Sequence, residues 1–243
     1  MIQVHELEKS FGTVKAVENV SFEARDGFIT GLLGPNGAGK STTLRILYTV
    51  LRPDGGSARV DGRDVTGEAL EVRKRIGVLP HSSGLYPHLT ARENIRYFGR
   101  MNGLNGEALD LRIDDLMTLL EISEFADRRA KGFSQGQRTK VALARALVHD
   151  PKNVLLDEPT NGLDVMATRA LRDIIRRLKD DGRCVLFSSH VMQEVAALCD
   201  EIVIIDRGRV VAAGTPDAIR KETGLDSLED AFVAALGTDE GLE

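Results

Sequence analysis

The feature that most constrains the fold of this sequence is the glycine-rich segment Gly34–Ser41. It follows the apolar run Phe28–Leu33, which is typical of a buried strand, and it precedes Thr42–Leu51, where leucines recur at helical spacing. Glycines let backbone N–H groups approach phosphate oxygens, and a helix N-terminus adds unpaired N–H donors and the positive end of its dipole. The segment therefore predicts a strand, a phosphate-binding loop and a helix start. The residues expected to hold phosphate are Gly34, Pro35, Asn36, Gly37, Ala38, Gly39, Lys40, Ser41 and Thr42.

Two side chains of this loop and two acids further along the chain indicate the chemistry of the site. Lys40 is expected to reach the β- and γ-phosphates of a nucleotide, and the Ser41 hydroxyl is expected to ligate Mg²⁺. The apolar run Asn153–Leu156 ends in Asp157 and Glu158, and the carboxyl ends of strands in an open α/β sheet face the ligand. We expect Asp157 to hold Mg²⁺ and Glu158 to orient and deprotonate an attacking water. The alternative, that the two acids only end a strand, is disfavoured by the loop upstream.

The composition limits the kinds of partner. With 243 residues, 42% of them hydrophobic, the chain can form one large α/β domain or a core with a subdomain. The net charge of −5 provides no basic surface, so we expect no nucleic-acid partner. No apolar run reaches the roughly 18 residues that cross a bilayer, and the N-terminus lacks a signal-peptide pattern, so membrane association is expected only through a partner. Cys184 and Cys199 are expected to be buried, reduced thiols, as in cytoplasmic proteins.

Strand and helix patterns alternate along most of the chain, which predicts an α/β fold with a mostly parallel sheet covered on both faces. Residues 1–80 and 150–225 are expected to form the core, and residues 81–149, which are mostly helical in pattern, an insert. Residues 226–243 should form a short helix and a frayed tail. The expected strands are Met1–Phe11, Val17–Ala24, Phe28–Leu33, Ala58–Val60 in a hairpin, Ile76–Leu79, Asn153–Leu156, Cys184–Phe187, Glu201–Asp206 and Arg209–Ala213.

A second helix N-terminus that could accept an anion follows Phe133. Ser134 stands where a helix N-cap would, Gly136 leaves the first helical turn open, and an apolar and basic helix follows. Taken alone the pattern is weak, because a serine and a glycine before a helix usually form only a cap. Whether this helix start binds an anion or is only a cap depends on the other motifs of the chain.

Together these motifs resemble the ATP-binding subunits of ABC transporters. The motifs that carry the resemblance, in the order and spacing of that family, are Gly34–Ser41, Phe133–Gln137, Asp157–Thr160, Gly162–Asp164 and Ser188–His190. The second of them is similar to the family signature LSGGQ. The resemblance covers residues 1–225 and implies a P-loop NTPase (RecA-like) core with an antiparallel β subdomain and a helical insert. Leu79–Tyr97 and the helix that ends at Leu236 resemble exporter-type subunits that accompany sodium, drug or similar ABC-2 permeases.

The resemblance implies ATP as the nucleotide and Mg²⁺ as the metal, and it assigns further roles. Phe11 would stack on adenine, unless it is only a core residue at a strand end. His190 would contact the γ-phosphate and the catalytic carboxylate, so that Lys40, Glu158 and His190 are the expected catalytic residues. The residues expected to meet the nucleotide of an opposite subunit, or to cross the interface with it, are Ser134, Gly136, Gln137 and Asp164.

Two positions depart from the family pattern. His81 stands where the family usually has a glutamine that reaches Mg²⁺ and the attacking water. A neutral imidazole can ligate a metal, whereas its protonated form is repelled by Mg²⁺, so metal contact at His81 stays open at this point. Gln135 replaces the first glycine of the signature and could crowd the phosphate.

The resemblance implies ATP hydrolysis that energises a separate membrane permease at the inner face of the cell membrane, and it favours export as the direction of transport. The ATPase would work as a head-to-tail pair with a second copy or a paralogue, and Ser82–Thr90 is a candidate docking segment for the permease. One alternative is an ABC ATPase that clamps ribosomes or DNA; such proteins carry two cassettes or a long coiled coil, and neither pattern is found in this sequence. Another is a small-molecule P-loop kinase, which would need an acceptor pocket and a basic lid.

Overall fold

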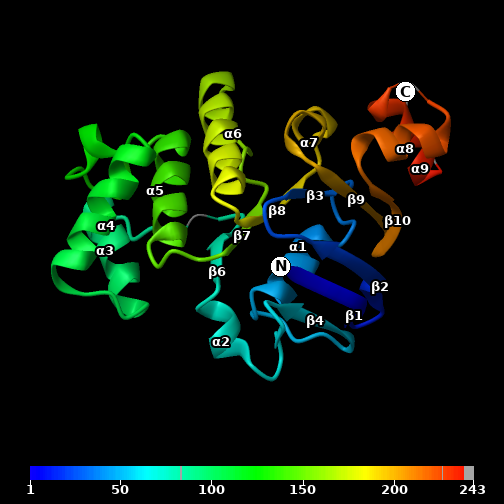
Figure 1. The fold of residues 1–243 in the computed structure, drawn as a ribbon, viewed down its shortest axis with the longest axis horizontal. Coiled ribbons are helices and arrows are strands. Elements are labelled where there is room, and N and C mark those ends of the chain that lie inside the picture. Colours follow the sequence, from blue (N-terminus) through cyan, green and yellow to red (C-terminus); the bar gives the residue numbers. More distant parts are fainter. Residues whose placement is uncertain (83, 226, 238–243) are drawn as a thin grey trace.

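The computed structural model describes residues 1–82, 84–225 and 227–237. A six-stranded sheet with the order β10-β9-β3-β8-β7-β6 forms its centre (Figure 1). The strands from β9 to β6 in this order pair in parallel, and only β10 is antiparallel to its neighbour. The predicted parallel sheet is therefore confirmed. Its strands are β3 (Ile29–Leu33), β6 (Ile76–Leu79), β7 (Asn153–Asp157), β8 (Cys184–Ser189), β9 (Glu201–Asp206) and β10 (Arg209–Gly214).

A second, antiparallel sheet has the order β2-β1-β4-β5. Asp61 and Gly62 both have positive φ, at 48° and 76°, which is the backbone that a two-residue hairpin turn requires. The predicted hairpin is confirmed. Helix α1 (Lys40–Leu47) buries Leu44 and Leu47 in a cluster shared with residues of both sheets, so it fastens the two sheets together. The strands of this sheet are β1 (Ile2–Phe11), β2 (Val14–Ala24), β4 (Gly55–Val60) and β5 (Arg63–Asp64).

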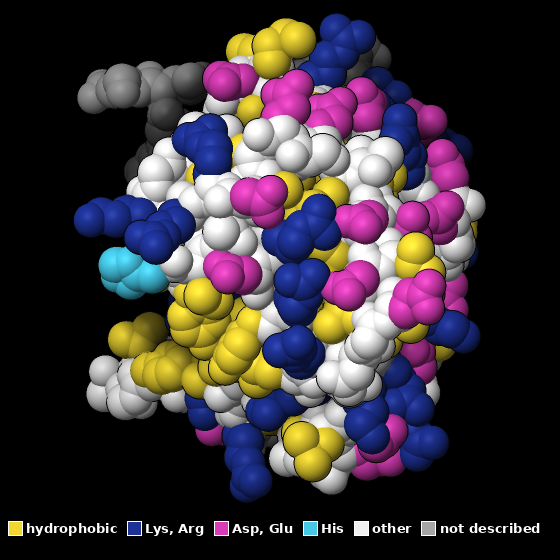
Figure 2. Space-filling view, turned by 90° about the vertical axis from the view of Figure 1, so that its left-hand side faces the viewer, with side chains coloured by type: hydrophobic (Ala, Val, Ile, Leu, Met, Phe, Trp, Pro, Cys, Tyr) yellow, Lys and Arg dark blue, Asp and Glu magenta, His cyan; other side chains and the backbone are white. Residues whose placement is uncertain are grey.

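A helical region lies between β6 and β7 in the chain and to one side of the sheet (Figure 1). It contains α3 (Ala91–Met101), α4 (Gly106–Leu119) and α5 (Gln135–Leu147), with short 3₁₀ turns at Ser123–Phe125 and Ala130–Gly132. The apolar stripes that predicted these helices are buried in one cluster, which includes Ile113 of α4 and Val141 of α5. Figure 2 looks onto this region and shows hydrophobic side chains gathered on part of its surface.

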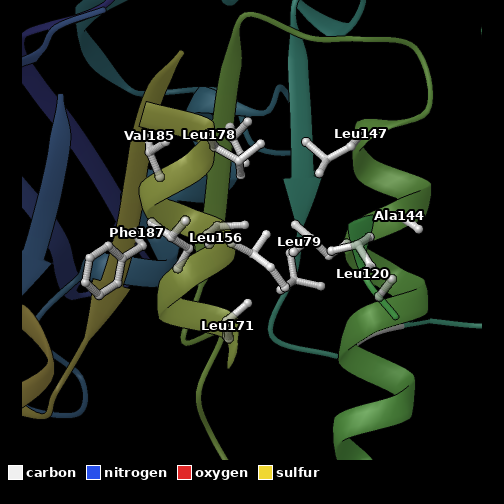
Figure 3. Packing of buried hydrophobic residues seen from close by; sticks show 14 of the residues in the cluster. Leu79, Leu120, Ala144, Leu147, Leu156, Leu171, Leu178, Val185 and Phe187 are labelled. Atoms are coloured by element: carbon white, nitrogen blue, oxygen red, sulfur yellow. The ribbon is translucent and has the colours of Figure 1, made fainter. Parts of the chain in front are cut away.

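The main core fills the space between the central sheet and the helices that cover it. Figure 3 shows Leu79 of β6 and Leu156 of β7 between Leu147 of α5 and Leu171 and Leu178 of α6 (Val165–Asp180). These side chains are at most 4% exposed. The apolar face of α6 is thus the face that packs on the sheet.

The C-terminal end of α5 is fastened to both parts of the molecule. Arg112 of α4 donates hydrogen bonds to Leu147 O at 2.9 Å and to Asp150 Oδ1 at 3.0 Å. Arg183, just before β8, donates to the same Asp150 oxygen at 2.7 Å and to Pro151 O at 2.6 Å. Asp150 therefore joins an arginine of the helical region to an arginine of the core.

The remaining helices lie near the predicted positions, with two additions. Helix α9 (Leu228–Leu236) matches the short helix predicted within residues 226–243, and Ser227 is its N-cap; helix α7 (Met192–Leu198) lies between β8 and β9. Helices α2 (Ala69–Arg73) and α8 (Pro216–Thr223) were not expected. The tail predicted to be frayed lies outside the described residues after Gly237.

Cys184 and Cys199 both carry free thiols; Cys184 is buried as predicted, whereas Cys199 is only partly buried. Burial raises the pKa of the Cys184 thiol to about 12 and raises that of Cys199 as well. In the part of the chain that the structure describes, no helix combines the length and the apolar character needed to cross a bilayer.

Candidate active site

The glycine-rich loop connects β3 to α1 and packs closely against its surroundings. A Cβ atom on Gly34 would lie 2.1 Å from Ile205 O, and one on Gly39 would lie 2.3 Å from Ala16 O. Gly39 also has a φ of 107°, which L-residues with side chains rarely adopt. Both glycines are therefore required by the packing of the loop as well as by the access it gives to a ligand.

A turn between β9 and β10 supports this loop from outside. Gly208 N donates to Ala38 O at 2.9 Å, and Gly208 O accepts from Glu18 N at 2.7 Å. At the start of α1, Thr43 donates to Gly39 O through both its backbone N–H and its hydroxyl, at 2.9 and 3.0 Å. The loop is thus held from the sheet side and from the helix side.

Lys40 points into the loop. Its side chain is 4% exposed, and Nζ donates to Gly34 O at 2.6 Å and to Pro35 O at 3.0 Å. Nζ also lies 3.9 Å from Glu158 Oε1. Burial lowers the pKa of the Lys40 ammonium, and the charges of Glu158 and Asp157 act in the opposite direction. The cation is held where a phosphate in the loop would meet it.

Asp157 at the end of β7 meets the first turn of α1. Its Oδ1 accepts hydrogen bonds from Ser41 Oγ at 2.9 Å and from Ser188 Oγ at 2.8 Å. Its Oδ2 is buried and has no hydrogen-bond partner among the described residues. Ser188 also accepts a hydrogen bond from Glu158 N at 3.0 Å, so one serine orients both acids.

Nitrogen atoms of three side chains surround Glu158. His190 Nδ1 lies 3.3 Å from Glu158 Oε1, and His81 Nδ1 lies 3.7 Å from Glu158 Oε2. With Lys40, these side chains come from the start of α1, from the residue after β8 and from the segment after β6. Glu158 itself is 11% exposed and has a φ of 48°, an uncommon value for a residue with a side chain. The predicted catalytic residues are thus assembled in one place.

The segment predicted to accept an anion begins α5 as expected. Ser134 is the N-cap and its Oγ accepts from Gln137 N at 3.3 Å, while Gln137 Oε1 accepts from Ser134 N at 3.1 Å. Asp164 is the N-cap of α6 and accepts from Ala167 N at 2.8 Å. In this state the Gln137 and Asp164 side chains serve as helix caps.

Ser134, Gly136, Gln137 and Asp164 line one open cavity of about 1030 Å³. The residues Gly34–Ser41 do not line it. Gln135 borders this cavity and also a smaller one of about 50 Å³ beside His81, Asp157 and Glu158. The predicted residues therefore form two separate sites on the same chain. We call Gly34–Ser41 with its neighbouring acids the loop site, and Ser134, Gly136, Gln137 and Asp164 the helix-end site.

Phe11 ends β1 and is 49% exposed. Lys9 Nζ lies 5.7 Å from the centroid of its ring. A ring that is half exposed can offer a face to a planar ligand, and it is not the core residue that was the alternative.

Sequence reasoning gave no role to Ser188, Thr160 or Glu194. Thr160 Oγ1 and Ser189 Oγ both donate to Glu194 Oε2, at 2.6 and 3.0 Å. A glutamate in a short helix carries no pattern that distinguishes it from a solvated residue. Ser188 could have been suspected, since it ends a buried strand next to the one that carries Asp157.

A glycine-rich loop after β3 with a buried lysine, close to an acid pair at the end of β7, defines a P-loop nucleoside triphosphatase. A model of the ABC transporter family matches residues 17–161. The chain belongs to the ABC transporter family, as an ATP-binding subunit with ATPase activity.

Named relatives agree with this assignment. The ABC transporter ATP-binding protein NatA of Bacillus subtilis is 44% identical over 224 residues, which cover 92% of this chain and 91% of NatA. The Nod factor export ATP-binding protein I of Ralstonia nicotianae is 38% identical over 230 residues, which cover 94% of this chain and 72% of that protein. The dimeric structure of the ATP-binding cassette MJ0796 in a post-hydrolysis state, bound to ADP and Pi, superposes with a TM-score of 0.81 at 26% identity and covers 88% of this chain and 98% of that one.

Proposed function

We propose that this chain hydrolyses ATP with Glu158 as general base, and that Lys40 and His190 act on the γ-phosphate. The observation that carries this proposal is the approach of Lys40 Nζ and His190 Nδ1 to one carboxylate, at 3.9 and 3.3 Å, beside a glycine-rich loop. Phosphoryl transfer depends mainly on positioning and on neutralising charge. When the triphosphate is bound, Lys40 can exchange its carbonyl partners for phosphate oxygens, and Glu158 can accept a proton from water.

Mg²⁺ fits the residues beside the loop. Ser41 and Asp157 would hold it, because the second carboxylate oxygen of Asp157 is buried without a partner among the described residues. Those residues contain no group of three His, Cys, Asp or Glu side chains that could hold a metal ion alone, and Mg²⁺ commonly binds one or two protein ligands together with waters and phosphates. The ion would supply neutralisation of phosphate charge. His81 faces Glu158 in this structure, and its contact with a metal stays a prediction.

The helix-end site is proposed to complete the active site of a second subunit. The first turn of α5 presents backbone N–H groups and the positive end of its dipole beside Ser134 and Gly136. Pairing of cassettes is supported by the dimeric form of MJ0796. In such a pair Ser134, Gly136 and Gln137 would meet the γ-phosphate held by the other copy, and Asp164 would cross between the copies. The second subunit is either another copy of this chain or a paralogue.

A permease is proposed to dock on the helical region. Tyr86, Tyr97 and Met101 are 44%, 43% and 67% exposed, and hydrophobic side chains gather on this face in Figure 2. The backbone next to them is held firmly, because buried Asn94 accepts from Tyr86 N at 2.9 Å and donates to Thr90 O at 2.9 Å. These residues overlap the predicted docking segment 82–90, of which residue 83 lies outside the described residues. The name of the Ralstonia relative supports an export system, and docking would place this chain at the cytoplasmic face of the membrane.

The role of Glu158 is tested with Glu158→Gln. The amide keeps the shape of the side chain but cannot take a proton, so hydrolysis should fall by about 10²–10⁴-fold while ATP still binds. Phosphate release and ATP binding are measured on the purified chain, and the ATP-bound form should accumulate as a dimer in size-exclusion chromatography. Glu222→Gln, on an exposed residue of α8, is the matched control. Normal hydrolysis by Glu158→Gln contradicts the proposed base.

The shared site is tested with Ser134→Arg. A bulky cation at the N-cap of α5 removes the anion site without touching the loop, so ATP binding should persist and turnover should stop. Ser57→Arg on an exposed position of β4 introduces the same charge elsewhere and should be silent. Full activity of the Ser134 variant, or of wild-type chain diluted until it is monomeric, refutes the two-subunit site. Co-purification of a polytopic membrane protein from solubilised membranes tests the permease.

A further inference from the structure

One carboxylate joins the two segments that carry Glu158 and His190. Glu194 Oε2 on α7 accepts a hydrogen bond from Thr160 Oγ1 at 2.6 Å and another from Ser189 Oγ at 3.0 Å. Thr160 lies two residues after Glu158, and Ser189 directly precedes His190. A single oxygen atom therefore holds both segments.

In both hydrogen bonds to Glu194 the hydroxyl group is the donor and the carboxylate oxygen is the acceptor. An ionised carboxylate accepts but does not donate, so both hydroxyls must donate to Glu194. Ser189 Oγ also accepts from Val191 N at 3.0 Å, which leaves its proton for the carboxylate. Ser189 is 2% exposed, so water does not compete for this hydrogen bond. The distance from Thr160 is in the short range typical of hydroxyl donors to carboxylates.

We propose that Glu194 is a positioning residue for ATP hydrolysis, which sets the placement of His190 against Glu158 through Ser189 and Thr160. This inference rests on the proposed roles of Glu158 and His190. Their contact joins the ends of two different strands, β7 and β8, and depends on how those ends are held. Ser188 fixes the start of both segments, because it binds Glu158 N, and Glu194 fixes them again just beyond.

The first test compares Glu194→Ala with Glu194→Gln. The alanine variant releases both hydroxyls, and because a misplacement of about 1 Å can cost about 10²-fold in rate, kcat should fall by about 10- to 100-fold. The KM for ATP should change by less than about twofold, since Glu194 lies outside the loop. A glutamine carbonyl oxygen has two lone pairs and can accept both hydroxyls, so Glu194→Gln should retain most of the kcat. Gln193→Ala, on the exposed face of the same helix, is the matched control.

A second measurement separates positioning from general stability. In the His190→Ala background, Glu194→Ala should lower kcat by less than about twofold, because the contact that it positions is already gone. An equal loss in both backgrounds, or wild-type kcat in Glu194→Ala, overturns the proposal. Should Glu194→Ala fail to fold, Thr160→Val and Ser189→Ala are judged by the same double-variant criterion.

Glu158→Gln measured alongside distinguishes this inference from the function it rests on. An impaired Glu158→Gln together with an unimpaired Glu194→Ala rejects the role of Glu194 alone. A fully active Glu158→Gln rejects the proposed base and the positioning role with it.

Discussion

Two buried hydroxyls on neighbouring strands allow the value of hydrogen bonding beside the active site to be measured. Ser188 of β8 and Thr30 of β3 are both 0% exposed. Ser188 donates to Asp157 and accepts from Glu158 N, whereas the Thr30 hydroxyl has no hydrogen-bond partner within the described part of the chain. The same chemical change, loss of a hydroxyl, should therefore have opposite effects at the two positions.

The magnitudes follow from these partners. Ser188→Ala loses a hydrogen bond to a charged group, which contributes about 1.5–3 kcal/mol, and it leaves the Glu158 N–H without its acceptor. We expect a loss of about 2–4 kcal/mol in the free energy of unfolding. Thr30→Val removes a hydroxyl whose burial costs about 1–3 kcal/mol and keeps the shape of the side chain, so stability should rise by about 1 kcal/mol.

Both changes are measured by urea unfolding, with circular dichroism as the signal. The urea concentration at the midpoint should shift, while the slope of the unfolding free energy against urea concentration stays constant. ATP hydrolysis by Ser188→Ala should also fall, because this serine orients Asp157 and Glu158. A Ser188→Ala protein within about 0.5 kcal/mol of wild type, or a Thr30→Val protein less stable than wild type by about 1 kcal/mol, would refute the assignment of these hydrogen bonds.

Two further predictions concern the glycine-rich loop and the half-buried His149. Gly39→Ala places a Cβ 2.3 Å from Ala16 O at a φ of 107°, so we expect a loss of at least about 2 kcal/mol in the free energy of unfolding and weaker ATP binding. Thermal unfolding and ATP titration measure the two effects. Gly132→Ala, where a Cβ has open space, is the control and should be neutral. Burial lowers the pKa of His149, whose Nε2 lies 3.0 Å from Ile76 O, while the unfolded chain titrates near pH 6.5. The unfolded state therefore binds the proton first, and stability should fall as the pH drops below about 6.5, by up to about 1.4 kcal/mol per pH unit. His149→Gln should flatten this slope, and an unchanged slope in urea unfolding at pH 5.5–7.5 would count against the burial effect.

The structural elements that have a strong local sequence pattern could be predicted from the sequence alone. The loop, the buried strands and the helices with apolar stripes all lie where the sequence pattern predicted them. The pattern places apolar residues on one face of each helix or strand, and the same face is buried in the fold. Strand β8 extends to Ser189, two residues past its apolar run, because pairing with β3 continues there. That extension buries Ser188 beside Asp157, which apolar periodicity alone does not reveal.

Helices α2 and α8 and the hydrogen bonds of Glu194 were not predicted from the sequence, each for a different reason. Helix α2 has only five residues, too few to show a period. Helix α8 did carry signals, namely Thr215 as N-cap, Pro216 in the first turn and Gly224 at the end, and these were overlooked. The contacts of Glu194 arise only when the chain brings β7 and β8 together, so no local pattern predicts them.

Helix α5 carries the helix-end site at one end and is held by arginine hydrogen bonds at the other. Its thirteen residues span about 20 Å, from the serine-capped end to the end clamped by Arg112, Asp150 and Arg183. A tilt of about 5° around the clamp swings the capped end by about 2 Å, which is enough to make or break a hydrogen bond. A small rearrangement where the helical region meets the core would therefore produce a larger displacement of Ser134 at the other end of the helix.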